Sequence, residues 1–238
     1  MDILVQHGSI LVILAAVVGF FMAWGIGAND VANAMGTSVG SKALTIKQAI
    51  IIAMVFEFAG AYLAGGEVTS TIRKGIIDPS FFVEIPELLV FGMISALFAA
   101  ATWLLVASVL GWPVSTTHSI VGGVLGAGIA AGGFGIANWS KMGAIASSWV
   151  ISPVLGGLIA VAFLLFIKKK IIYQTDMLGA ARKYVPVLIA LMAWAFSTYL
   201  ALKGLKKIYK MDFQTAALAG FVIAMLFYAC VRPLISKA

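Results

Sequence analysis

Long apolar runs separated by short polar segments make up most of this chain. A bilayer has a hydrocarbon core about 30 Å thick, which takes roughly 20 apolar residues of helix to cross. Runs of about this length predict six transmembrane spans, at residues 10–34, 47–65, 88–110, 142–167, 185–202 and 213–231. Short segments rich in glycine, hydroxyl or charged residues separate them, and residues 35–42 and 66–87 are predicted to be loops.

A seventh apolar segment, residues 113–133, begins with proline and contains six glycines. Proline fits the first turn of a helix, because its missing N–H would have no partner there. The glycines indicate either a closely packed crossing helix or a re-entrant hairpin, and the sequence leaves both open. The predicted fold is an all-α polytopic membrane protein with six or seven transmembrane helices, some of them discontinuous or re-entrant.

The amino-acid composition agrees with a polytopic membrane protein and argues against a nucleic-acid-binding protein. The 238 residues are 62% hydrophobic and 11% charged, which is typical of polytopic membrane proteins. Basic clusters give a net charge of +7 and are expected to mark span ends at membrane lipid headgroups rather than to bind nucleic acid. Without a soluble segment, residues 1–238 are predicted to be a single transmembrane domain, located in the plasma membrane, which in a bacterium is the inner membrane.

A first polar motif lies inside the first predicted span. It contains Asn29, Asp30 and Asn33. A carboxylate within a membrane is costly, so Asp30 indicates function, with a helix cap as its alternative role. Gly25 and Gly27 are expected to let the helix unwind here and free backbone groups for a ligand.

A second polar motif follows Pro113 and places Ser115, Thr116 and Thr117 in the opening turn of a predicted helix. Helix N-termini carry a partial positive charge and bind anions such as phosphate. Hydrogen bonding between helices is the alternative role of these hydroxyls. The two motifs together predict an oxyanion site with five candidate ligands: Asn29, Asp30, Ser115, Thr116 and Thr117.

Two carboxylates, Asp30 and Glu57, oppose an anion site, because Glu57 is expected near the middle of the second span. They would repel a buried anion unless a cation enters with it or they are protonated. The sequence therefore predicts coupling to Na⁺ or H⁺ through Asp30, Asn33 and Glu57, or transport of a metal–phosphate complex. Oxygens of Asp30 and Asn33 are possible Na⁺ ligands, and no other cofactor is expected.

Other classes predict different behaviour. In an anion channel the polar motifs would line a pore, but two carboxylates at mid-depth would reject anions. In a non-transporting assembly module the motifs would only join helices. No motif places a nucleophile beside a base, so an enzyme is not expected.

The two motifs carry a resemblance to a known family. Residues 27–34, GANDVANA, resemble the signature of the inorganic phosphate transporter (PiT) family, and residues 113–119, PVSTTHS, resemble its partner motif. The resemblance implies transport of inorganic phosphate with Na⁺ or H⁺ or as a metal–phosphate complex, or of sulfate as in some relatives. It also implies that Asp30, Glu57 and Ser115 are important for transport.

The chain departs from that family in one respect. The resemblance implies two inverted halves that each carry a signature, whereas this sequence has one copy. The chain therefore resembles the N-terminal half of an inverted-repeat transporter. Its second half is expected either in the same polypeptide or in a separate chain, including a second, antiparallel copy. A homodimer is expected, and this chain alone is not expected to transport.

Overall fold

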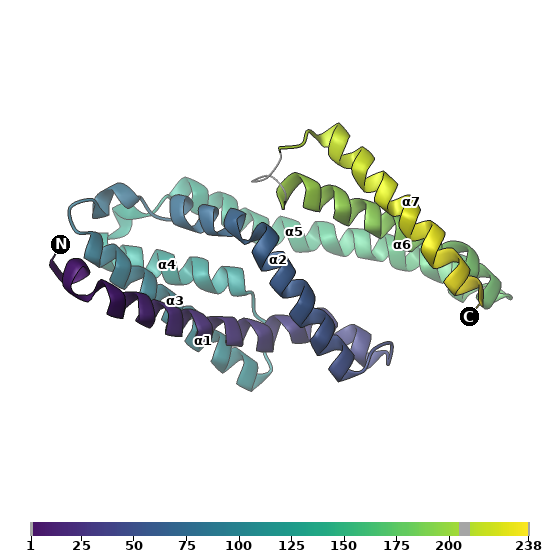
Figure 1. Ribbon diagram of the computed structural model, residues 1–238, viewed down its shortest axis with the longest axis horizontal. Coiled ribbons are helices and arrows are strands. Elements are labelled where there is room, and N and C mark those ends of the chain that lie inside the picture. The colour runs from purple at the N-terminus through teal and green to yellow at the C-terminus, as the bar shows by residue number, and fades with distance from the viewer. Residues whose placement is uncertain (1, 205–209, 238) are drawn as a thin grey trace. The chain divides into compact units, whose positions relative to one another are not determined.

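The described chain is helical. The computed structural model describes the backbone of residues 2–204 and 210–237, and the side chains of residues 3–62, 75–204 and 210–236. Its α-helices are α1 (Asp2–Gly40), α2 (Ile46–Gly75), α3 (Pro86–Leu110), α4 (Thr116–Gly132), α5 (Trp139–Ile167), α6 (Met177–Lys203) and α7 (Phe213–Lys237) (Figure 1). Five described helices are long and apolar enough to cross a membrane, which confirms the all-α polytopic fold class.

Contacts divide the chain into two compact units. Unit 1 comprises Met1–Ala59 and Val68–Ala144, and it contains α1, α3 and α4. Unit 2 comprises Gly60–Glu67 and Ile145–Ala238, and it contains α6, α7 and most of α5. Both polar motifs belong to unit 1.

In unit 1, α1 and α3 run parallel and pack closely. A methyl group on Gly25 would lie 3.2 Å from Cβ of Leu104, and one on Gly19 would lie 3.9 Å from Leu97. The contacts advance in the same direction along both helices, so the helices are parallel. Leu104 is fully buried in the cluster at this interface.

Helix α4 packs against α3 in the opposite direction (Figure 1). A methyl group on Gly123 would lie only 2.7 Å from the carbonyl oxygen of Ala96, and one on Gly92 would lie 3.9 Å from Ala127. Position 123 therefore needs glycine, because any side chain would collide with the backbone of α3. The α3–α4 hairpin places its connecting segment, residues 111–115, at one end of unit 1.

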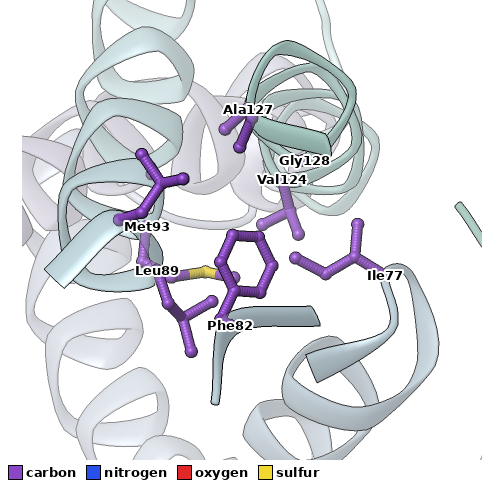
Figure 2. A pocket seen from close by; sticks show the side chains of 10 residues that line it. Ile77, Phe82, Leu89, Met93, Val124, Ala127 and Gly128 are labelled. Carbon is purple, nitrogen blue, oxygen red and sulfur yellow. The ribbon is translucent and has the colours of Figure 1, made fainter. Parts of the chain in front are cut away.

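The other end of this hairpin is closed by apolar side chains. Ile77 forms an antiparallel bridge with Ala137. Figure 2 shows the ring of Phe82 between side chains of α3, α4 and Ile77. The cavity that they enclose holds about 10 Å³, the space of roughly one water, and its lining residues are all apolar. It is a packing defect and offers no group that could bind an anion.

Unit 2 is built around the α6–α7 hairpin. The indole Nε1 of Trp194 donates a hydrogen bond to the carbonyl oxygen of Ala217 at 2.9 Å, and its ring meets Phe221 edge to face. A π-helical turn, Lys168–Ile172, follows α5 and packs against α6.

The backbone departs from three predictions. Helix α1 is continuous through Gly25 and Gly27, so the predicted unwinding was wrong, and it ends at Gly40, so the loop predicted at 35–42 begins only after that residue. Helix α2 ends at Gly75 and takes up the first ten residues of the loop predicted at 66–87, which leaves residues 76–85 as the connection to α3. A continuous helix satisfies every backbone group internally, which a membrane favours. The side chains of the charged residues Glu67, Arg73 and Lys74 lie outside the described residues.

Candidate functional site

Asn29 connects the two polar motifs. Its side chain is 6% exposed, and it is the one buried polar side chain in the described part of the chain. Its Nδ2 donates to the carbonyl oxygen of Trp112 at 2.9 Å, and its Oδ1 accepts from the backbone N of Val114 at 3.3 Å. Oδ1 also accepts from Nδ2 of Asn33 at 3.1 Å. One amide therefore fixes the backbone of the second motif against α1.

The second motif is irregular because of its own sequence. Gly111 ends α3 in the left-handed region, with φ of 71°, and its N–H bonds to the carbonyls of the last turn. Pro113 has no N–H and disfavours helix for the residue before it. The N–H groups of Gly111 and Trp112 bond back to the last turn of α3, whereas the carbonyl of Trp112 and the N–H of Val114 are bonded by Asn29.

Helix α4 begins with a side-chain cap. Ser115 is its N-cap, and its Oγ accepts from the backbone N of His118 at 3.3 Å. Within the described residues nothing accepts from the Ser115 hydroxyl, so its proton can donate to a ligand. Backbone N–H groups in the first turn of a helix, here those of Thr116 and Thr117, have no intrahelical partner. The start of α4 thus presents several donors.

Asp30 lies at this helix start. The hydroxyl of Thr116 donates to Oδ2 of Asp30 at 2.8 Å, and both residues are half-buried. Asp30 itself sits in the middle of α1, so it does not cap its own helix. A carboxylate is favoured near a helix N-terminus, because the unpaired N–H groups carry partial positive charge.

The structure thus forms two hydrogen-bonded pairs at the start of α4, Asn29 with Asn33 and Asp30 with Thr116. Ser115 and Thr117 are exposed at the same helix start. Glu57 is exposed on α2, and no hydrogen bond or ion pair links it to any part of the chain that the structure describes.

The first motif differs from its prediction. It provides side chains from within a continuous helix, and the prediction that it unwinds to expose backbone was wrong. Gly25 allows α1 and α3 to approach. The backbone roles of Trp112 and Val114 were not predicted from the sequence. A signal was present, since an extended segment next to Pro113 needs partners and an asparagine amide offers both a donor and an acceptor.

One known protein family matches most of this chain. The model of the phosphate transporter family matches residues 26–235, which include both motifs. The chain belongs to the phosphate transporter family. Its membrane-spanning helices make it an integral membrane protein, and bacterial relatives support an inner-membrane location.

Two bacterial relatives are named "Putative phosphate permease". The protein of Helicobacter pylori strain J99 is 47% identical over 229 residues, which are 96% of this chain and 43% of the relative. That of Haemophilus influenzae is 49% identical over 208 residues, which are 87% of this chain and 50% of the relative. The chain therefore spans about half the length of these curated relatives.

A solved structure shares the fold. It is titled "The sodium-dependent phosphate transporter", and it matches with a TM-score of 0.85 and 39% identity. The match covers 95% of this chain and 55% of that one. The resemblance to phosphate transporters predicted from the two motifs is thus confirmed.

Proposed function

We propose that residues 1–238 act as one transmembrane half of a cation-coupled phosphate symporter that works by alternating access. Family membership and the phosphate permeases among the relatives support phosphate as the substrate. The sodium-dependent neighbour supports Na⁺ as the co-transported ion. The second half comes from the same polypeptide or from another chain, and the complete transporter is a homodimer.

The hydrogen bond between Asp30 and Thr116 carries the proposal. It places a carboxylate among the donors at the start of α4, which is where an anion would be favoured. Phosphate entering this place meets the negative charge of Asp30. Binding therefore requires a cation between them or a proton on the carboxylate, and this requirement couples the two ions.

Each member of the site has a proposed role. The backbone N–H groups of Thr116 and Thr117 and the hydroxyl proton of Ser115 bind phosphate, together with the amide of Asn29. Oxygens of Asp30 and Asn33 hold Na⁺, a hard cation that prefers oxygen ligands. Glu57 takes part in coupling from α2.

Phosphate uptake into proteoliposomes tests the proposal. The complete polypeptide that carries this chain would be reconstituted, and radioactive phosphate uptake measured with and without an inward Na⁺ gradient. We expect saturable, Na⁺-driven uptake that falls at least tenfold in Asp30→Asn. The matched control is Asp212→Asn, because Asp212 caps α7 through Gln214 and Thr215 and an asparagine can cap as well.

Three results would contradict it. Uptake by Asp30→Asn equal to that of the parent would remove Asp30 from the coupling site. Stronger competition by sulfate than by unlabelled phosphate would change the substrate. Unitary currents independent of any gradient would favour an anion channel.

A further inference from the structure

Five basic residues gather at one end of unit 2, and the proposed symport does not use them. They are Lys168, Lys169, Lys170, Arg182 and Lys183, here called the basic end. The three lysines open the π-helical turn Lys168–Ile172, which follows directly on α5. π-Helical turns are rare, and they occur frequently at functional sites.

The π-helical turn is held by specific bonds. The backbone N of Tyr173 donates to the carbonyl oxygen of Lys168 at 2.9 Å, and Nε2 of Gln174 donates to that of Lys169 at 2.7 Å. Ile171 is buried and anchors the turn, while Lys169 and Lys170 are exposed. The turn thus directs lysine side chains outward from a fixed backbone.

Helix α6 carries the other two basic residues, Arg182 and Lys183, beside the end of α5. The rings of Phe166 and Tyr184 meet edge to face, with centroids 5.6 Å apart, and join the end of α5 to the first half of α6. Nζ of Lys183 lies 5.5 Å from the centroid of the Tyr184 ring, and Arg182 and Lys183 are both exposed.

The described side chains form no ion pair with the basic end. Among residues 3–62, 75–204 and 210–236, no carboxylate pairs with any of its five cations. The one acidic residue in the connection, Asp176, accepts from the backbone N of Gly179 as the N-cap of α6. Five basic residues with one acidic residue in their connection leave an excess of positive charge, which attracts an anionic partner.

The position of the basic end at the membrane surface indicates which anion it meets. The basic end joins two candidate spans, Trp139–Ile172 and Met177–Lys203, so it lies where apolar helices leave the hydrocarbon core. Tyr173 is 71% exposed there, and tyrosine side chains are enriched at the headgroup level. Clusters of four to eight basic residues in this position bind anionic lipid.

We propose that the basic end binds the headgroup phosphates of anionic phospholipids, with the π-helical turn holding its lysines at the membrane surface. The attraction is electrostatic, so it weakens as salt shortens the screening length. This inference is independent of the proposed transport function.

Native mass spectrometry of the complete polypeptide in detergent tests it, with phosphatidylglycerol and phosphatidylcholine as probes. We expect phosphatidylglycerol to be retained in preference, with about a tenfold loss of apparent affinity in Lys169→Gln/Lys170→Gln. The matched control is Lys203→Gln/Lys210→Gln, which removes the same charge from the opposite end of the α6–α7 hairpin. It should change the affinity less than twofold.

A conservative variant separates charge from folding. Lys169→Arg/Lys170→Arg keeps both charges and should bind phosphatidylglycerol like the parent. Equal losses of affinity in the two glutamine variants would mean that lipid binding depends only on the net charge of the chain, and would overturn the proposal. Equal retention of both lipids by the parent would overturn it too. Displacement of phosphatidylglycerol by millimolar inorganic phosphate, at constant ionic strength, would identify a free phosphate site instead.

Discussion

The two polar motifs of unit 1 contribute to the proposed site in different ways. Asn29, Asp30 and Asn33 belong to an uninterrupted helix whose backbone groups bond to one another, so they offer only side chains. The segment from Trp112 to Thr116 leaves one helix and begins another, so it offers backbone groups as well. The continuous helix thus provides a rigid frame, and the irregular segment provides donors that need that frame.

Removing the side chain of Asn29, which links the two motifs, should have the largest effect on stability. Asn29→Ala removes three part-buried hydrogen bonds, including those to the carbonyl of Trp112 and the N–H of Val114, at a cost of roughly 2–4 kcal/mol in unfolding free energy, because each hydrogen bond contributes about 0.5–1.5 kcal/mol. Denaturant unfolding in mixed micelles, followed by circular dichroism, would measure it.

The control for this prediction is on the same helix. Asn33→Ala removes one hydrogen bond from an exposed side chain and should cost less than about 1 kcal/mol. Equal losses for the two variants would mean that the second motif keeps its shape without Asn29.

The hairpin behind the second motif offers the next test. Gly123→Ala would push a methyl group to 2.7 Å from the carbonyl oxygen of Ala96. Overpacking of this kind typically costs about 1–3 kcal/mol, and the displacement of α4 would move Thr116 away from Asp30. Both the unfolding free energy and Na⁺-driven uptake should fall.

Its neighbour is a matched control, because a methyl group on Gly122 would meet nothing within 4 Å. Gly122→Ala should leave the hairpin intact and keep uptake at the level of the parent. A loss in Gly122→Ala as large as that in Gly123→Ala would contradict close helix packing as the reason for glycine.

These contrasts show what the sequence can predict. The run of apolar residues at 88–110 located α3 to within two residues at each end, because length and hydropathy define a span. The two motifs were recognised as partners from their residue types. The continuity of α1 could not be predicted, since glycine permits both an unwound turn and a close helix contact, and only the position of Leu104 decides between them.

A smaller effect, on the Na⁺ dependence of uptake, is expected when the hydrogen bond between Asp30 and Thr116 is removed. Thr116→Val keeps the side-chain shape but removes the donor to Asp30. A hydrogen bond contributes about 1 kcal/mol, so the Na⁺ concentration for half-maximal uptake should change roughly fivefold. Thr117→Val is the control for this parameter, because the Thr117 hydroxyl is not bonded to Asp30; a larger change there would assign the cation contact to Thr117.

The smallest expected effect is the difference in stability between alanine variants of two glycines of α1, Gly25 and Gly27. Gly27→Ala meets no atom within 4 Å and should gain up to about 1 kcal/mol from helix propensity, with uptake retained. Gly25→Ala places its methyl group 3.2 Å from Leu104, so α1 and α3 must separate slightly and the gain should be lost. If Gly27→Ala stabilised the fold as expected but stopped transport, the result would mean that α1 unwinds during the transport cycle. The rigid frame would then be a property of one state of the transporter, and the two motifs would differ less than this structure indicates.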